Sequence, residues 1–261
     1  TMVSAKNPHT PLCLDAVNTY YGRPDIQIGI LRGEGVEAKS RYAKQVADKY
    51  PHSVKSSDEL PDAADLYREI LANAPDKSVV IVTVGFLSNL RDLLNSQPDD
   101  FSDLNGEGLV QKKVARYVCM GGNFPEGKEY NIHRDELASV RAVHDWPTPI
   151  VFSGYEIGRK VMTGARLAET PEDNPVRTAY FHYNGLKDRE SWDHTAVLYA
   201  VRGLRNYWDM HKPGFNLIHW NGTNEWLDTE DKDHAHLVEK MDPKELAEQI
   251  EEFMITPPKK R

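Results

Sequence analysis

The sequence predicts an α/β protein in which a mostly parallel sheet is flanked by helices. Short apolar runs, typical of strands buried on both faces, alternate along the chain with longer segments of helical spacing. Glycines follow several of these runs, where the chain has to turn. The 261 residues are 39% hydrophobic and 28% charged, which is ordinary for a globular protein of this class. We therefore expect one domain over residues 1–261.

The apolar runs predict five strands, and a further strand end lies near the start of the chain. They are residues 26–31, 78–84, 114–120, 148–153 and 215–220, with the strand end at residues 2–5. The first predicted helix begins after Thr10-Pro11 and ends near Gly22, because proline suits a first helical turn and glycine a helix end. The other predicted helices are residues 62–74, 88–95, 134–144, 191–201 and 243–254.

Residues 168–193 are polar and rich in turn formers, so we expect a long surface excursion there, with the character of a lid and no domain boundary. In open α/β sheets the ligand lies beyond the carboxyl ends of the strands. The loops to consider therefore follow Val84, Met120, Ser153 and Trp220.

Charge and cysteine content restrict the partners. The net charge of -8 and the pI near 5.7 argue against nucleic acid, which requires a basic face. No apolar run approaches the roughly 18 residues that a membrane helix needs. Cys13 and Cys119 are too few for a disulfide framework or a thiolate zinc site, and we expect two buried thiols. The basic end at residues 259–261 is expected to be solvated.

The loop after Met120 carries the most informative polar pattern. Gly121-Gly122 allows close approach of a ligand, and Glu129 and Asn131 alternate around Tyr130. In an extended segment the two side chains point the same way, and together they can pair with vicinal sugar hydroxyls. The alternative is a loop whose polar groups cap the next helix.

Two further strand ends carry candidate groups. Asp193 stands in the first turn of a predicted helix, beside its apolar face. There it either binds a cation or is simply a carboxylate stabilised by the helix dipole. After the strand that ends near Val84, the helix begins with Ser88 or Asn89 as cap. Backbone carbonyls at such a strand end can bind a hard cation such as calcium, although an ordinary strand-to-helix turn has the same sequence.

These segments together resemble the nucleoside hydrolase family, over roughly residues 1–255. Leu87-Ser88-Asn89 is similar to the family's Leu-Thr-Asn turn. Met120-Gly121-Gly122, with Glu129-Tyr130-Asn131 and Asp135 after it, resembles the family's Met-Gly-Gly block with its Glu-Phe-Asn and downstream Asp. Asp193 with Ala196-Val197 looks like the His-Asp-x-x-Ala-Val helix start, and Asn7 followed by a helix and residues 22–26 resembles the segment leading to the family's third strand.

The resemblance implies a nucleoside hydrolase-like fold with a Rossmann-like core, and a reaction in which calcium-bound water cleaves the N-glycosidic bond of a ribonucleoside or related N-riboside. It implies that Asp193 and the Val84 carbonyl bind calcium. It places the sugar against Asn7, Asn123, Glu129 and Asn131. It also implies a small-molecule nucleoside or riboside as partner and leaves room for a homo-oligomer.

Two departures from the family keep other functions open. Trp192 replaces the histidine that precedes the metal-binding Asp, so the group that activates the leaving base is unassigned. The alternatives are an acid such as His182, His234 or His236, or aromatic stacking on the base. The opening Asp-x-Asp-x-x-x-Asp-Asp type motif is absent from the 261 residues. A sheet without this central strand leaves a buried gap, so we expect a first strand and helix upstream. The alternatives are a non-catalytic nucleoside- or sugar-binding relative, or a hydrolase of another glycosidic substrate.

Overall fold

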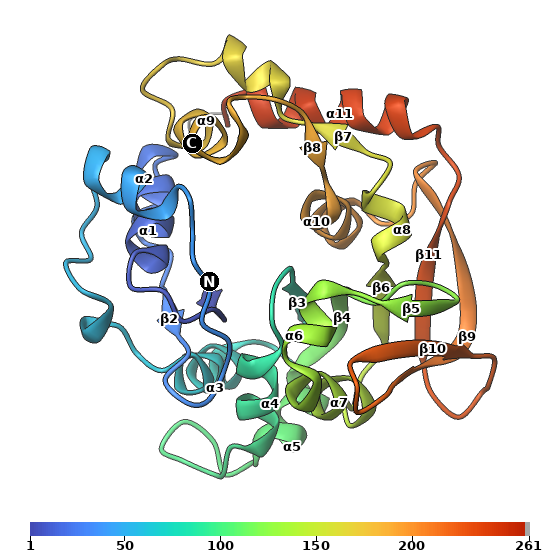
Figure 1. Ribbon diagram of the computed structural model, residues 1–261. Helices are drawn as coiled ribbons and strands as arrows, with labels where there is room; N and C mark the ends of the chain where they lie inside the picture. Colours follow the sequence, from blue (N-terminus) through green and yellow to red (C-terminus); the bar gives the residue numbers. More distant parts are fainter. Residues whose placement is uncertain (259–261) are drawn as a thin grey trace.

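The computed structural model describes residues 1–258, so the basic end at residues 259–261 lies outside the described part. Its centre is a seven-stranded sheet in the order β3-β4-β6-β11-β9-β10-β5 (Figure 1). The strands are β3 (Val79–Thr83), β4 (Val114–Met120), β5 (Glu126–Lys128), β6 (Ile150–Ser153), β9 (Trp208–Ile218), β10 (Thr223–Leu227) and β11 (His234–Glu239). Helices flank this sheet, which confirms the predicted α/β class.

The sheet is parallel in one half and antiparallel in the other. β3, β4, β6 and β11 pair in parallel, whereas β9 pairs antiparallel with β11 and β10, and β10 with β5. Two small sheets stand apart from it. One is parallel, β1 (Met2–Val3) with β2 (Gly29–Ile30), and the other is antiparallel, β7 (Met162–Thr163) with β8 (Arg189–Glu190). β3 is thus the end strand of the large sheet.

Helices cover both faces of the parallel half (Figure 1). The α-helices are α1 (Thr10–Tyr20), α2 (Ala43–Lys49), α3 (Ala63–Asn73), α4 (Ser88–Asn95), α5 (Gly106–Lys113), α6 (Tyr130–Arg134), α7 (Glu136–His144), α8 (Tyr155–Gly158), α9 (Pro175–Asn184), α10 (Trp192–Arg202) and α11 (Pro243–Ile255); short 3-10 turns are η1 (Ser57–Glu59) and η2 (Ala165–Glu169). Tyr117 of β4 packs with α4, α5 and α7, and its neighbour Val118 packs with α8, α10 and α11. This alternation places a core on each face, as parallel strands require.

Residues 168–193 were predicted as a long surface excursion with the character of a lid, and the structure adds that they contain α9. Asn174 caps this helix by accepting from the backbone N–H of Val176 at 2.8 Å, and Pro175 follows at its first position. The Tyr50 and Thr178 hydroxyls, 2.6 Å apart, join α9 to the end of α2. The turn formers in this stretch are therefore a helix start, which the prediction missed.

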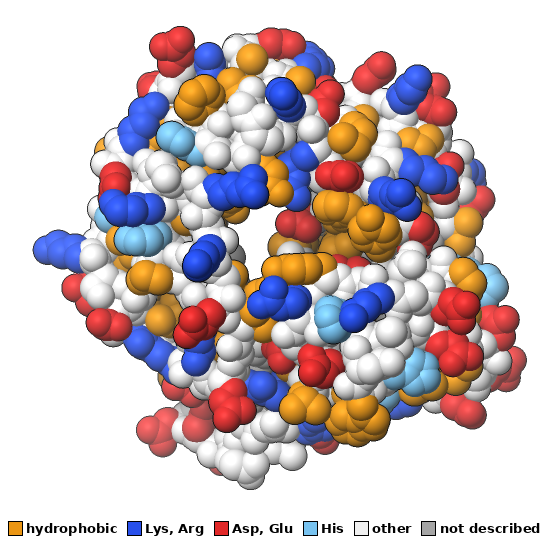
Figure 2. Space-filling view, in the orientation of Figure 1, with side chains coloured by type: hydrophobic (Ala, Val, Ile, Leu, Met, Phe, Trp, Pro, Cys, Tyr) orange, Lys and Arg blue, Asp and Glu red, His pale blue; other side chains and the backbone are white. Residues whose placement is uncertain are grey.

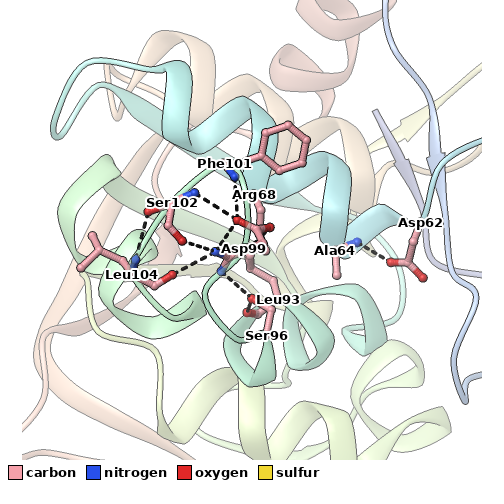
Figure 3. A network of polar contacts seen from close by, with 9 residues as sticks. All are labelled: Asp62, Ala64, Arg68, Leu93, Ser96, Asp99, Phe101, Ser102 and Leu104. Atoms are coloured by element: carbon pink, nitrogen blue, oxygen red, sulfur yellow. Dashed lines mark hydrogen bonds and ion pairs between the residues drawn. The ribbon is translucent and has the colours of Figure 1, made fainter.

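Arg68 of α3 fixes the loop between α4 and α5 (Figure 3). Its guanidinium is buried and makes two bonds to the Asp99 carboxylate, at 2.6 and 2.9 Å. It also donates to the Ser96 hydroxyl and to the carbonyls of Ser102 and Leu104. Asp99 therefore serves the scaffold, as a partner of a buried charge.

Both cysteines are buried with free thiols, as expected. Within residues 1–258, no helix combines the length and the apolar character that crossing a membrane would take.

Candidate functional site

A large cavity separates the free side of β3 from β1. Its volume is about 1000 Å³, and consecutive residues of both segments line it, 79–86 on one side and 1–5 on the other. Figure 2 shows the hollow at the centre of the molecule. Because β3 ends at this cavity, the groups predicted at its carboxyl end border an open space.

Val84 and Asn89 both line this cavity, on either side of the turn between β3 and α4. The predicted capping role of Asn89 is wrong, because Leu87 occupies the cap position and no side chain caps α4. Ser88 instead bonds to the Asp135 carboxylate. The Asn89 side chain is buried, and its Oδ1 has no hydrogen-bond partner among the described residues. A buried amide oxygen without a partner is costly, which marks Asn89 as a candidate ligand contact.

Glu129 and Asn131 lie at the end of β4, but not on an extended segment as predicted. Asn131 belongs to α6, and the buried Glu129 carboxylate caps that helix, accepting from the N–H groups of Asn131 (2.9 Å) and Ile132 (3.1 Å). Burial raises the pKa of Glu129, and these amides oppose the rise. The Asn131 amide donates to the Met120 carbonyl at 3.3 Å. The capping alternative is therefore what the structure has, and it fixes both side chains at the strand end.

Asp193 lies in the first turn of α10, and its carboxylate has no hydrogen bond or ion pair within the described residues. The side chain is accessible, yet enough protein surrounds the carboxyl that burial raises its pKa to about 6, opposed by Arg189. Its charge also raises the pKa of Glu129, so the two acids act on one another. Tyr42 feels the same charge, and both Tyr42 and Arg189 line the large cavity. Asp193 therefore lies within electrostatic reach of both Glu129 and Tyr42, although it does not itself line the cavity.

Comparison with known proteins places this arrangement in a fold family. No protein-family model matches the chain, and no curated protein matches it in sequence. Solved structures do match. An inosine-guanosine nucleoside hydrolase has a TM-score of 0.69 at 16% identity, over 94% of this chain and 86% of its own. A plant nucleoside hydrolase has a TM-score of 0.66 at 19% identity, over 95% and 87%.

The chain has the nucleoside hydrolase fold. A third match is the type III effector protein XopQ, solved in complex with adenosine diphosphate ribose, with a TM-score of 0.58 at 15% identity over 92% of this chain and 76% of that one. Likeness at these identities establishes the fold, while function has to be argued from the site.

None of the four predicted sugar contacts of this nucleoside hydrolase fold is among the residues that line the large cavity. Asn7 accepts from the His9 N–H at 2.9 Å, donates to the Ala38 carbonyl at 2.8 Å, and lines a separate cavity of about 380 Å³. Asn123 is joined through its backbone to the Asn224 side chain. The structure therefore places Glu129 and Asn131 at the end of β4, next to the end of β3 where Val84 lines the cavity. Asp193 is within electrostatic reach of Glu129.

The histidines considered for the leaving base also lie elsewhere. His182, His234 and His236 are not among the residues that line the large cavity. His234 is buried on β11, where its Nδ1 accepts from the Asn216 N–H at 3.2 Å and burial lowers its pKa to about 3. His236 stacks on Phe124, with ring centroids 4.4 Å apart. Trp192, next to Asp193, turns toward α8 and donates its indole N–H to the Tyr155 carbonyl at 2.9 Å.

The described residues do not by themselves fit a calcium ion. Calcium takes six to eight oxygen ligands, several from carboxylates. Residues 1–258 contain no group of three or more His, Cys, Asp or Glu side chains placed to hold a metal ion. Of the acids near the site, Glu129 is already engaged with helix amides and Asp193 stands alone. No catalytic step is therefore assigned to the metal.

Sequence reasoning missed the cations and tyrosines of the cavity. Lys39, Arg41 and Arg189 line it, and none of the three forms an ion pair within residues 1–258. The Arg189 guanidinium lies 4.3 Å from the centre of the Tyr183 ring. Lys39 and Arg41 come from a connecting segment, whereas Arg189 belongs to β8 and Tyr183 to α9. None of them is part of a recognisable motif, so only the folded chain shows that they line one cavity.

Proposed function

We propose that this chain binds a ribonucleoside or a related N-riboside and hydrolyses its N-glycosidic bond. One observation carries the proposal: Glu129 and Asn131 lie at the carboxyl end of β4, next to the end of β3 that lines a cavity of about 1000 Å³. The charge of Asp193 acts on Glu129 at this end of the sheet. Ligands of open α/β sheets bind at such strand ends. The nucleoside hydrolase fold of the chain supports the same reaction class.

The amides and the buried acid suit a sugar. Glu129 has acceptor capacity beyond its bonds to the helix amides, because a carboxylate offers about four lone-pair positions. The unpaired Asn89 Oδ1 accepts, and the Asn131 amide group donates. Vicinal hydroxyls both donate and accept, so ribose can satisfy all three side chains.

Asp193 has the properties of a catalytic base. With a pKa of about 6 it is mostly ionised at neutral pH, and it is basic enough to take a proton from an attacking water. The water oxygen bonds to the anomeric carbon as the bond to the base nitrogen breaks and its electron pair leaves with the base. The charged carboxylate also stabilises positive charge on the sugar.

Tyr42 is our candidate for the residue that stabilises the departing base. It lines the cavity, and burial raises its pKa, so its hydroxyl keeps the proton at neutral pH and can donate a hydrogen bond. A base that departs toward Tyr42 is stabilised as negative charge develops on its nitrogen.

Release of free ribose from inosine and uridine tests the reaction, with and without chelator and added calcium. Asp193→Asn should lower kcat at least about 100-fold, as expected on loss of a general base. Asp103→Asn is the matched control, since Asp103 is exposed and outside the site. If the folded, calcium-supplied protein released no ribose, or if Asp193→Asn released it at the normal rate, the proposed mechanism would be excluded for these substrates.

A second candidate is binding of an anionic riboside without cleavage. The observation in its favour is the set of cations in the cavity, which suits phosphate groups. The match to XopQ, solved with adenosine diphosphate ribose, supports the same ligand class. Calorimetric titration with adenosine diphosphate ribose tests it: Arg189→Met should weaken binding about 10-fold or more, whereas exposed Arg205→Met should not. Absence of binding at millimolar ligand would reject this candidate.

A further inference from the structure

We propose that a second cavity, on the half of the large sheet away from β3, binds a small organic cation of the guanidinium type. Its volume is about 490 Å³, a size typical of sites for small molecules. Strands β9, β10 and β11 and helix α8 contribute to its lining, and it shares no lining residue with the large cavity. Figure 1 shows these elements on the side of the molecule opposite α1 and α2. The inference is therefore independent of the reaction proposed above.

Aromatic rings form one wall of this second cavity. Phe124, His236 and His211 stack on one another, with ring centroids 4.4 and 5.1 Å apart and planes inclined by 4° and 20°. The Trp226 indole stands across the stack, at 80° to both histidines. His211 ends the stack and keeps 47% of its side chain exposed, so a planar group can continue it. Flat, delocalised cations bind well against such rings.

Two glycines make room for the groups of this wall. A Cβ on Gly154 would overlap both carboxylate oxygens of Glu156 and would lie 2.6 Å from Cδ2 of Phe124. A Cβ on Gly214 would overlap the Trp226 indole. The wall therefore depends on close backbone approach at two separate positions, which distinguishes it from a chance gathering of surface side chains.

The second cavity carries an excess of negative charge. The carboxylates of Glu156, Asp228 and Glu239 line it, together with the ammonium group of Lys160. Lys160 pairs with Glu239 at 2.8 Å. Asp228 accepts from the Trp226 indole N–H at 2.9 Å. Glu156 forms no ion pair within residues 1–258, so a cationic ligand has a carboxylate available.

Glu156 selects a ligand that donates hydrogen bonds. The carboxylate accepts from the Phe124 N–H at 3.1 Å, which holds it in the cavity wall. A carboxylate offers about four lone-pair positions, so acceptor capacity remains. Partial burial raises the pKa of Glu156, and a cation bound beside it would favour the charged form.

Backbone groups add further acceptors. β11 continues for three residues beyond His236, its last pair with β6, and residues 237–239 line the cavity. A quaternary ammonium has no N–H to offer these groups or Glu156. A guanidinium is planar, donates two parallel bonds to one carboxylate and has further N–H groups to spare. Stacking surface and acceptors together therefore favour guanidinium over other organic cations.

Three probes separate these properties: butylguanidinium, neutral butylurea and butyltrimethylammonium. NMR titration follows the indole N–H signal of Trp226, which is assigned by its loss in Trp226→Phe. We expect a saturable shift with butylguanidinium and binding at least about 10-fold weaker with the other two, because each loses the charge or the paired donors. Equal binding of all three probes would overturn the proposal. Tighter binding of glycyl-arginyl-glycine, blocked at both ends, would overturn the assignment to a small molecule in favour of a protein side chain.

Variants of the chain locate the bound cation. Glu156→Gln keeps an acceptor for the Phe124 N–H but removes the charge, and should weaken butylguanidinium binding at least about 10-fold. Glu248→Gln, at an exposed position of α11 outside the cavity, is the matched control and should leave binding unchanged. Circular dichroism shows that both variants are folded.

Lys160→Met changes binding in the opposite direction. Lys160 acts on Glu156 and competes with a bound cation, so its loss should strengthen butylguanidinium binding by about 3-fold, a modest gain because the ammonium group is exposed. A misfolded protein cannot produce this gain. Ribose release should be the same in all of these variants, since their residues lie outside the large cavity. Full binding by Glu156→Gln, or weaker binding by Lys160→Met, would reject the second cavity as a cation site.

Discussion

Asp193 and Glu129 are two carboxyl groups whose surroundings disfavour their charged forms. Burial raises the pKa of each, and the charge of Asp193 also opposes the ionisation of Glu129. Glu129 is compensated by helix amides, while Asp193 has Arg189 within electrostatic reach and no hydrogen-bond partner in the described structure. An uncompensated acid beside a cavity is more consistent with function than with stability.

The raised pKa of Asp193 predicts a loss of stability on ionisation. The folded-state pKa of about 6 exceeds the ordinary value of 3.8, so the folded state holds the proton more tightly and the free energy of unfolding falls as pH rises from about 4 to about 6. Asp193→Asn should remove this fall and stabilise the protein at pH 8 by about 1 kcal/mol, a figure reduced for the accessibility of the side chain. Urea unfolding at pH 4 and pH 8 measures it. Equal pH dependence in both proteins would contradict it.

Asp99 shows the opposite behaviour. The Arg68 guanidinium lowers its pKa to about 2, so the pair stabilises the fold above about pH 4 and is lost as pH falls toward 2. Asp99→Ala should cost about 3 kcal/mol at pH 7, the low end for breaking a buried pair, because Arg68 keeps its bonds to Ser96 and to two carbonyls. Asp100→Ala, next to it and exposed, should change stability by less than about 0.5 kcal/mol. Chemical denaturation separates the two; similar costs would refute the special role of Asp99.

At the scale of elements, α9 depends on one capping residue. Asn174 caps the helix and donates its amide to the Tyr21 hydroxyl, 3.2 Å away after α1. Asn174→Ala should cost about 1 kcal/mol and increase hydrogen exchange throughout α9. Asp173→Ala removes an exposed neighbour and should do neither. Exchange measured by mass spectrometry decides this, and an unchanged α9 in the Asn174 variant would show that tertiary contacts alone hold the helix.

The elements that the sequence could predict are those with an apolar pattern of their own. Residues 114–120 and 88–95 match β4 and α4 because continuous burial and helical spacing are local signals. β9 and β11 were missed in whole or in part, since their exposed antiparallel faces carry residues such as Lys212 and Glu239. Asp193 was predicted from its helix start, whereas Arg189 and Tyr42 became site residues only when distant segments met.

At the scale of the molecule, the large cavity separates a small N-terminal layer from the main sheet. The cluster of Cys13, Ala16, Ala43, Val46 and Tyr50, and a second one of Val3, Ile28 and Ile30, are distinct from the two large clusters around the seven-stranded sheet. Small cores bury little apolar area. The layer that contains α1, α2, β1 and β2 is therefore expected to be less stable than the part of the molecule around the seven-stranded sheet.

This division predicts that the N-terminal layer opens before the sheet does. Amides in α1 and α2 should exchange at least about 10-fold faster than those in β4 and β6, which lie between the two large cores. Low urea should widen the difference if opening is a partial unfolding, because more surface is exposed than in a local fluctuation. A ligand that fills the cavity should slow exchange in α1 and α2 selectively, since it contacts both sides. Native-state hydrogen exchange measures all three effects, and a single exchange rate for both parts would mean that the chain unfolds as one unit despite its cavity.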